Sequence, residues 1–361
     1  MKKQLFYSAV AMALLASCNS GSSGNNNYPG KPTNFVGVRN LYKCLPSDLP
    51  TMSGNGFKIA YGENCTVADA NNNIKPILES MAIAITKYNA ERYCTGTPLS
   101  YDPDTGYGYV LSAAHCVMGN QGKNAGVEVT SDNIGTFTSN INYVSQVLDA
   151  SGRNFNTGTI TAVYIPQQYC KNYSIVYGRS GYQCSNLAGQ DGDIALFRVH
   201  YDTPVNYNTH VKLASPSLNI PYPSYIMALG YGITNSDENN TNLYYITYEY
   251  FAKNSYMGEN GLSTIMNGYS VNNAFYSIIC GGDSGGGDFY WDGTNWQLVG
   301  VHSYGSLQCG AASPSYSGAM DASADVRLFT NQLTNLIGST ESSCDNNLAA
   351  ANGFICAQQP N

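Results

Sequence analysis

The chain has 361 residues, enough for one large or two small domains with a full hydrophobic core. Only 11% of the residues are charged, well below the roughly one quarter that is usual in soluble proteins, and the net charge is −7. Because the sequence contains no cluster of basic residues, it argues against nucleic acid and anionic lipid surfaces as partners.

Residues 1–17 have the form of a secretory signal peptide, in which two lysines precede an apolar run from Leu5 to Ala16. The apolar run is short for a membrane-spanning helix. The segment Leu15–Cys18 resembles the lipobox of bacterial lipoproteins, which implies cleavage before Cys18 and attachment of lipid to its thiol. The alternative is an ordinary signal peptide that is cut near Ser17. We therefore expect an exported protein that is periplasmic, anchored in the outer membrane through Cys18, or at the cell surface or secreted.

Two further segments precede the main domain. Residues 18–34 are polar and of low complexity, which predicts a flexible tether. Residues 35–75 contain Cys44, Cys65 and several glycines and prolines. We interpret them as a small N-terminal extension, either a removable pro-segment or a permanent part of the protein.

Short strand-like runs broken by Gly, Pro, Asp and Asn dominate the main domain, residues 76–338. The clearest runs are 81–86, 109–112, 159–164, 194–199, 225–229 and 296–301, the last of which follows a hairpin turn at 292–295. Because no long helical period lies between them, the sequence predicts an all-β domain of sandwich or barrel type.

The end of the chain departs from this pattern. Ser323 or Asp325 can cap a helix whose apolar positions recur with a period of 3.6 residues, and Gly338 can end it. These apolar positions are Val326, Phe329, Leu333, Leu336 and Ile337. Residues 339–361 are then expected to form a tail that carries a disulfide.

The chain has 11 cysteines, an odd number for an exported protein. If Cys18 carries lipid, ten remain, and an oxidising compartment favours five disulfides. No Cys-x-x-Cys or His-x-x-x-His spacing is present, so we expect neither a metal site nor another cofactor.

A glycine-rich run, Cys280-Gly-Gly-Asp-Ser-Gly-Gly-Gly287, is the strongest local signal for chemistry. Glycines fill no core, but they allow backbone N–H groups to approach a reacting atom closely. Ser284 is therefore a candidate nucleophile, and the neighbouring N–H groups are candidate donors to an oxyanion. A flexible Gly/Ser linker is the alternative, against which the Cys and Asp inside the run argue.

Two further motifs supply a base and a carboxylate. His115 lies in Ser-Ala-Ala-His-Cys, and Asp193 lies in Gly-Asp-Ile-Ala-Leu. Together with Gly-Asp-Ser-Gly-Gly around Ser284, and in the order His, Asp, Ser, these motifs resemble those of the chymotrypsin-like serine proteases. The resemblance implies a double six-stranded antiparallel β-barrel with a C-terminal α-helix, to which this chain adds N- and C-terminal extensions.

The resemblance also implies the role of each residue. His115 is expected to act as general base and then acid, Asp193 to orient it, and Ser284 to attack the substrate. The backbone N–H groups of Gly282 and Ser284 are expected to form the oxyanion hole. The expected activity is that of a serine endopeptidase acting on polypeptides as a monomer.

Other segments fit the same family. Ala228–Gly232 resembles its Gly-Trp-Gly strand, with Tyr231 in place of the tryptophan. Ser303, Tyr304 and Gly305 resemble the Ser-Trp-Gly segment, which lines the cleft and pairs with the substrate backbone; Ser303 is also expected to bond to Asp193.

The resemblance implies two disulfides, Cys94–Cys116 and Cys280–Cys309. By elimination the remaining cysteines pair as Cys170–Cys184, Cys44–Cys65 and Cys344–Cys356. A cross-bridge between the N- and C-terminal extensions is the alternative for the last four.

The specificity pocket is expected to include Ile278, Ile279, His302 and the segment from Ser303 to Gly305. In the family, the residue six before the serine forms the floor of the pocket, and Ile278 there disfavours a basic side chain because the buried cation would be unpaired. Glutamate-specific members carry a histidine at the position of His302, but they also tend to line the pocket with hydroxyl groups, which Ile279 and Gly281 lack. We therefore expect an apolar or aromatic residue before the scissile bond, with glutamate as the alternative.

The sequence leaves open whether the protein needs cleavage to become active and whether it is an endopeptidase at all. In many members of the family, cleavage frees an Ile or Val whose ammonium pairs with the aspartate before the serine; Asp283 is available here, and Ile74 and Ile77 are candidate new N-termini. The competing functions are a catalytically silent surface binding or adhesion module on the same fold, and an esterase that uses the same triad.

Overall fold

The computed structural model describes residues 63–64, 81–87, 92–117, 141–147, 154–169, 192–202, 211–220, 225–232, 244–245, 249–251, 263–268, 281–292, 294–305, 321–339, 344 and 346–358. All of them belong to the compact unit Pro32–Asn361. Among these residues, no helix has the length and apolar character needed to cross a bilayer. Several predicted features lie outside the described residues, namely the signal peptide, the tether, and Cys18, Cys44, Cys65, Ile74, Ile77, Cys170, Cys184, Ile278, Ile279, Cys280 and Cys309.

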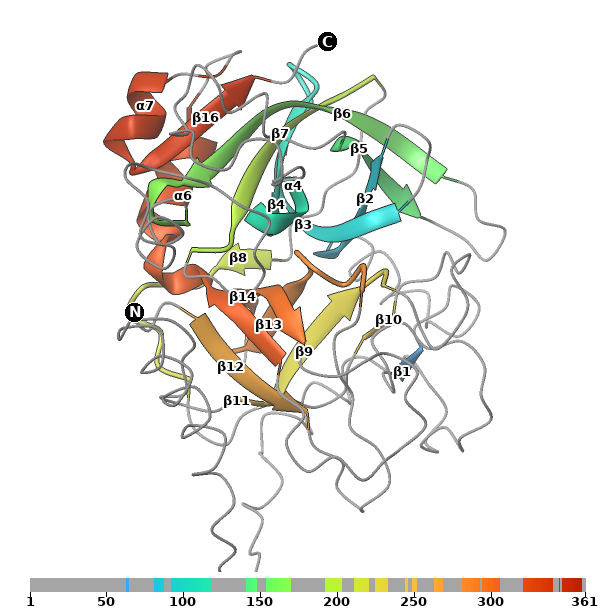
Figure 1. Cartoon of the computed structure of the whole chain (residues 1–361), viewed down its shortest axis with the longest axis vertical. Coiled ribbons are helices and arrows are strands. Elements are labelled where there is room, and N and C mark those ends of the chain that lie inside the picture. Colours follow the sequence, from blue (N-terminus) through green and yellow to red (C-terminus); the bar gives the residue numbers. More distant parts are fainter. Residues whose placement is uncertain are drawn as a thin grey trace, which may run out of the picture. The chain divides into compact units, whose positions relative to one another are not determined.

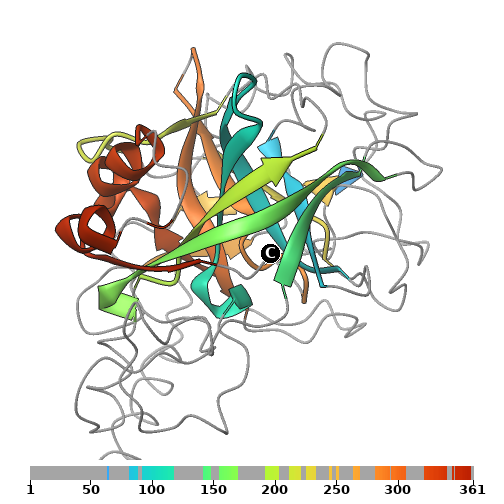
Figure 2. The ribbon, with the colours of Figure 1, turned by 90° about the horizontal axis from the view of Figure 1, so that it is seen from above.

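The first half of the described chain forms a closed β-barrel (Figure 1). Its strands pair antiparallel in the order β6-β5-β2-β3-β4-β7, and β6 also pairs with β7, which joins the two ends of the path. Figure 2 shows β6 and β7 running next to each other. The strands are β2 (Ile83–Lys87), β3 (Arg92–Asp102), β4 (Tyr107–Ser112), β5 (Ile141–Val147), β6 (Asn154–Pro166) and β7 (Ala195–Tyr201).

The second half repeats the arrangement. Six strands pair antiparallel in the order β9-β11-β12-β15-β14-β13, and the pairing of β13 with β9 closes the ring. They are β9 (Tyr225–Gly230), β11 (Glu249–Phe251), β12 (Ser263–Gly268), β13 (Gly287–Trp291), β14 (Trp296–Gly305) and β15 (Asp321–Asp325). Short strands extend this sheet: β8 (Val211–Leu213) runs parallel to β14, β10 (Tyr244–Tyr245) pairs with β9, and β1 (Glu63–Asn64) pairs with β10. The predicted all-β fold with two six-stranded barrels is therefore confirmed.

Local sequence explains the hairpin between β13 and β14. The carboxylate of Asp292 accepts hydrogen bonds from the N–H groups of Thr294 and Asn295, both at 2.8 Å. An aspartate that bonds to the backbone two and three residues ahead stabilises a tight turn. The turn brings Trp291 opposite Trp296 and so sets the register next to the turn, up to the irregularity between Asp288 and Phe289.

The predicted C-terminal helix is present in two parts. The 3-10 helix η3 (Val326–Leu328) is capped by Asp325, whose side chain accepts from the N–H of Arg327, and α6 (Thr330–Ile337) follows and ends at Gly338. Ser323, the other candidate cap, lies inside β15 instead. The expected apolar positions Val326, Phe329, Leu333 and Leu336 are buried, and Ile337 packs partly buried against the same core.

The residues after the helix do more than form a tail. Helix α7 (Asn346–Ala351) leads into β16 (Phe354–Gln358), which pairs antiparallel with β6 of the first barrel. Residues 354–357 are buried, and a disulfide joins Cys344 to Cys356. Because these two cysteines are bonded to each other, neither is available to bridge to the N-terminal extension.

Candidate active site

His115 and Asp193 meet although 78 positions separate them in the chain. His115 lies on the short helix α4 (Ala114–Val117) directly after β4, and Asp193 lies just before β7, the strand that pairs with β4. The ring nitrogen Nδ1 of His115 is 2.8 Å from Oδ2 of Asp193, and the backbone N–H of His115 donates to Oδ1 at 2.9 Å. The pairing of two neighbouring strands thus brings these side chains together.

The carboxylate of Asp193 has a third donor, from the second barrel. Ser303 on β14 donates a hydrogen bond from its hydroxyl to Oδ2. The side chain of Asp193 is fully buried, whereas that of His115 is 13% exposed. A buried carboxylate needs such donors, and here they also fix its direction toward the histidine.

This arrangement sets the chemistry of the histidine ring. A carboxylate only accepts hydrogen bonds, so Nδ1 of His115 carries the hydrogen. The lone pair of the neutral ring is then on Nε2. A partly exposed imidazole with a free lone pair and a buried carboxylate at its other nitrogen can accept a proton and hold the resulting charge.

The turn that holds Ser284 is bound to both barrels. Thr95 on β3 donates from its N–H to the carbonyl of Ser284 (2.8 Å) and from its hydroxyl to the carbonyl of Gly282 (2.9 Å). The same hydroxyl accepts from the N–H of Tyr231, which follows β9 (3.0 Å). One threonine therefore fixes the turn relative to the first barrel and to the end of a strand of the second.

Two backbone N–H groups of the serine turn are candidate donors to an oxyanion. Within the described part of the chain, the N–H groups of Gly282 and Ser284 donate to no residue. The turn is shaped by Gly285, which has φ +83° and whose substitution would place a Cβ 2.0 Å from the hydroxyl of Ser112. Two backbone N–H groups beside a serine that have no acceptor among the described residues can donate hydrogen bonds to a substrate oxygen that gains negative charge.

Asp283, next to the serine, is buried against the end of β9. Its carboxylate accepts from the N–H of Gly232 at 2.7 Å. A Cβ on Gly230 or Gly232 would lie 2.1 or 2.4 Å from Oδ1 of Asp283, so both glycines are needed for the carboxylate to approach. The Gly-Tyr-Gly segment identified in the sequence therefore makes room for the aspartate of the serine motif.

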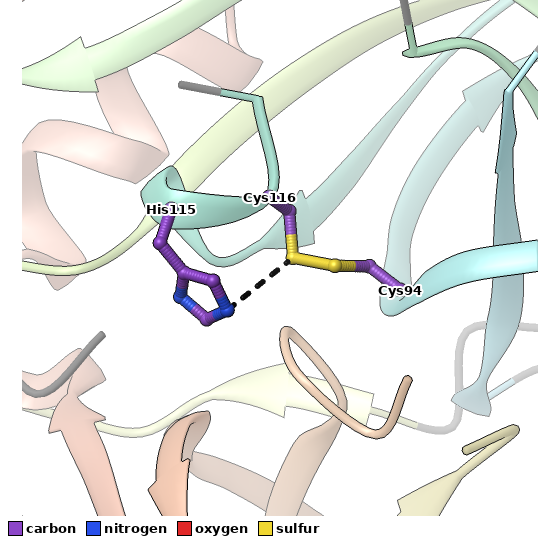
Figure 3. A group of neighbouring side chains, drawn as sticks. All are labelled: Cys94, His115 and Cys116. Atoms are coloured by element: carbon purple, nitrogen blue, oxygen red, sulfur yellow. Dashed lines mark hydrogen bonds between the residues drawn. A yellow bond between two sulfur atoms is a disulfide. The ribbon is translucent and has the colours of Figure 1, made fainter. Parts of the chain in front are cut away.

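Cys94, His115 and Cys116 lie together, as metal ligands often do (Figure 3). The two sulfurs, however, form a disulfide, and a metal requires thiolates. Sγ of Cys116 lies 3.9 Å from Nε2 of His115 and 3.7 Å from the carbonyl oxygen of Ser284. The disulfide thus fixes α4 to β3 beside both the histidine and the serine.

His302 and Asp288 form a second histidine–aspartate pair. Nε2 of His302 on β14 is 2.8 Å from Oδ1 of Asp288 on β13, and Nδ1 faces the carbonyl of Asp283 at 3.2 Å. The side chains of both are 1% exposed. Both ring nitrogens of His302 are therefore directed at oxygens of the protein itself.

The remaining predicted pocket residues are placed only in part. Tyr304 and Gly305 lie on β14 and pair with Ala322 and Asp321 of β15, and Gly281 is exposed at the start of the serine turn.

Thr95 and Asp288 are two site residues that were not predicted from the sequence. Thr95 could have been noticed because it follows Cys94, and Asp288 because it is an acidic residue in the apolar strand that begins just after Ser284.

The fold and the site together define a double barrel that brings a His–Asp pair and a serine turn side by side. The family model for trypsin matches residues 87–325, a span that includes His115, Asp193 and Ser284. The chain therefore belongs to the trypsin family, whose fold is that of serine-protease-type hydrolases. Its disulfides are in keeping with an extracellular or exported protein.

Solved structures give the same fold. A mutant of human heparin binding protein is similar with a TM-score of 0.52 and 14% sequence identity, over 80% of this chain and 100% of that chain. At this identity the similarity concerns the fold alone. The comparison with curated proteins gives no match.

Proposed function

We propose that this protein is an exported serine endopeptidase that cleaves peptide bonds through an acyl-enzyme. The observation that carries the proposal is the bond from Nδ1 of His115 to the buried carboxylate of Asp193. It leaves Nε2 as the base, in a chain whose serine turn is bonded to Thr95 and contacts the same Cys94–Cys116 disulfide as the histidine.

In acylation, the hydroxyl oxygen of Ser284 attacks the carbonyl carbon of the substrate while its proton passes to Nε2 of His115. The carbonyl oxygen becomes an oxyanion, which accepts hydrogen bonds from the N–H groups of Gly282 and Ser284. Asp193 stabilises the imidazolium. His115 then gives the proton to the departing amine as the carbon–nitrogen bond breaks.

In deacylation, water takes the place of the amine. His115 accepts a proton from the water as its oxygen attacks the ester carbon, and returns the proton to the oxygen of Ser284 when the ester bond breaks. The products are a free carboxylic acid and the regenerated enzyme.

For specificity, we favour an apolar or aromatic residue before the scissile bond over glutamate. A histidine that recognises a substrate carboxylate needs a ring nitrogen free to donate to it. Both ring nitrogens of His302 already face internal oxygens, which supports the apolar preference.

Labelling with a fluorophosphonate tests the activity, because this reagent modifies only an activated serine. The parent protein should label and should cleave a peptide library after apolar or aromatic residues, and Ser284→Ala should do neither. If the parent neither labels nor cleaves while it still binds a surface ligand, the alternative of a catalytically silent binding module would be correct. Faster turnover of esters without any peptide cleavage would instead identify an esterase.

The lipid anchor is a separate part of the proposal. Cells that express the protein with radioactive palmitate should label it, and Cys18→Ala should remove the label and release the protein from the membrane fraction. Sequencing the N-terminus of the active form distinguishes the alternatives for activation: a blocked N-terminus at Cys18 excludes activation by cleavage, and a start at Ile74 or Ile77 supports it.

A further inference from the structure

The buried pair of His302 and Asp288 has no part in the proposed reaction, yet it lies against the serine turn. Nε2 of His302 is 2.8 Å from Oδ1 of Asp288, and both side chains are 1% exposed. Burying two ionisable groups away from solvent costs free energy, and an apolar pair of similar size would destabilise the fold less. The presence of the pair therefore suggests a function.

The acceptors around the ring determine where its hydrogens are. The carbonyl of Asp283 can only accept, so Nδ1 of His302 carries a hydrogen and donates it. A proton must also lie between Nε2 and Oδ1 of Asp288, because otherwise a lone pair would face a carboxylate oxygen at 2.8 Å without solvent. Whether this proton is on nitrogen or on oxygen, the pair is neutral overall and the bond from Nδ1 to Asp283 is kept.

That carbonyl belongs to the peptide bond whose N–H is contributed by Ser284. It accepts a second hydrogen bond from the N–H of Gly286 at 2.9 Å. Hydrogen bonds to a carbonyl polarise the whole peptide group and strengthen its N–H as a donor. The N–H affected here is one of the two that the proposed mechanism assigns to the oxyanion hole.

The backbone of His302 holds the same turn. Its carbonyl accepts from the N–H of Gly285 (2.7 Å), and its N–H donates to the carbonyl of Gly286 (2.8 Å). His302 therefore contacts the turn through two backbone bonds and one side-chain bond.

We infer that His302, itself held by Asp288, is a positioning residue that orients and polarises the Asp283–Ser284 peptide for binding of the oxyanion. The inference rests on the proposed function, because it assigns a role within that reaction. It also gives a reason for a buried histidine at this position of β14.

His302→Phe tests the inference. The phenyl ring is similar in shape but has no hydrogen to donate to the carbonyl of Asp283, so this bond is lost. Asp288→Asn alone would not remove it, because the amide can donate to Nε2 and leave the hydrogen on Nδ1. We expect kcat for a peptide ester to fall about tenfold with KM unchanged, less than the ~100–1000-fold loss of a whole oxyanion donor. The inhibition constant of a peptide aldehyde, whose adduct carries an oxyanion, should rise by the same factor. An unchanged kcat and an unchanged aldehyde constant would overturn the inference.

A double variant separates positioning from stability. Replacing both partners with apolar residues, in His302→Val with Asp288→Val, removes the buried polar groups together and should restore the thermal midpoint toward that of the parent. The loss in kcat should persist, because the carbonyl of Asp283 then accepts only from the N–H of Gly286 and has lost the bond from the ring. Recovery of kcat along with stability would show a merely structural role. Asp325→Asn is the matched control: it breaks the pair that Asp325 forms with Arg327 at 2.6 Å and should leave kcat unchanged.

Nuclear magnetic resonance of protein labelled with ¹⁵N-serine and ¹⁵N-histidine gives a readout that needs no turnover. Nδ1 of His302 should carry a proton, and the amide nitrogen of Ser284 should move upfield in the double variant. An unprotonated Nδ1, or an amide nitrogen that does not move, would overturn the inference even in an active enzyme. If instead both signals behave as expected and the parent neither turns over substrate nor binds the aldehyde, the proposed function fails while the polarising contact stands.

Discussion

At the scale of single residues, the site depends on which atom carries which hydrogen. Asp193 accepts hydrogen bonds from the N–H and Nδ1 of His115 and from the hydroxyl of Ser303. The bond from Nδ1 leaves the lone pair of His115 on Nε2, and the other two fix the direction of the carboxylate. The same rule, that a carbonyl or carboxylate only accepts, fixes the orientation of His302. The two histidines thus use Nε2 in opposite ways: in His115 it carries the lone pair that accepts a proton, and in His302 it is bonded to Asp288.

Asp193→Asn is expected to lower kcat by about 10,000-fold while the fold is retained. The amide group of asparagine can donate to Nδ1 and so favours the tautomer that has its hydrogen on Nε2, where the base is needed. The measurement is hydrolysis of a peptide substrate at neutral pH, with the thermal midpoint as the check on folding. A folded variant with near-parental kcat would contradict the proposed role of Asp193.

At the scale of elements, the conformation of the serine turn depends on the absence of a side chain at Gly285 as well as on its hydrogen bonds. Gly285 lies in the left-handed region, and a Cβ at this position would lie 2.0 Å from the hydroxyl of Ser112 and 2.4 Å from the carbonyl of Thr95. The strain of a side chain at positive φ and the overlap of its Cβ should each cost about 1–3 kcal/mol.

Gly285→Ala is therefore expected to lower the free energy of unfolding by about 2–6 kcal/mol and to abolish labelling of Ser284. Gly353→Ala is the matched control, because Gly353 also has a positive φ (+73°) but no atom lies within 4 Å of a Cβ built there. Urea titration of both variants measures their free energies of unfolding. The loss in Gly353→Ala gives the cost of a side chain at positive φ, and the additional loss in Gly285→Ala gives the cost of the overlap with Ser112 and Thr95. Equal destabilisation of the two would show that the contacts of Gly285 contribute nothing.

The two described disulfides are expected to differ in their effects. Replacing Cys344 and Cys356 with alanine should lower stability by about 2–3 kcal/mol and leave kcat near that of the parent, because this bridge joins β16 to the segment before α7. Replacing Cys94 and Cys116 should lower both, since this bridge contacts His115 and Ser284. Thermal unfolding and peptide hydrolysis, measured on both double variants, test the difference; a large loss of kcat in the first would refute it.

The sequence predicts those parts of the molecule whose signals are local. The glycines around Ser284, the turn beginning at Asp292 and the periodic apolar residues of α6 each determine their own backbone, so strands, helix and motifs could all be identified. The presence of two barrels and the contact between His115 and Asp193 were predicted only from the resemblance to a family. Neither composition nor spacing contains this information.

Contacts between distant segments were not predictable in the same way. Thr95 bonds to Gly282 across 187 positions, and its residue type is ordinary for any strand. β16 pairs with β6 far back in the chain, and its short run of buried residues does not indicate a partner. Asp288 is an unusual residue in an apolar strand, but only the structure shows that His302 faces it.

At the scale of the whole molecule, the proposed reaction needs both barrels. His115 and Asp193 belong to the first, and Ser284 and Ser303 belong to the second. Thr95 and Ser303 each form hydrogen bonds from one barrel to the other. The catalytic geometry is therefore a property of the contact between the barrels.

Thr95→Val is expected to lower stability by about 1–3 kcal/mol and to reduce kcat, because the hydroxyl that bonds to Gly282 and Tyr231 is lost while the shape of the side chain is kept. Thr97→Val, on the same strand, is the control. The buried hydroxyl of Thr97 has no hydrogen-bond partner among the described residues, so its loss should be nearly neutral. Urea unfolding and peptide hydrolysis check both variants, and a Thr97→Val variant as damaged as Thr95→Val would contradict this account.

The C-terminal strand adds a consequence for protein engineering. A chain cut between Tyr201 and Val211 yields one fragment with the histidine and aspartate and another with the serine, so neither can hydrolyse a peptide by the proposed reaction. Because β16 belongs to the second fragment but pairs with β6 of the first, the second fragment carries its own docking strand for its partner. We therefore expect the two pieces to act as a split reporter, in which proteolysis by the proposed reaction returns only when the fragments reassemble.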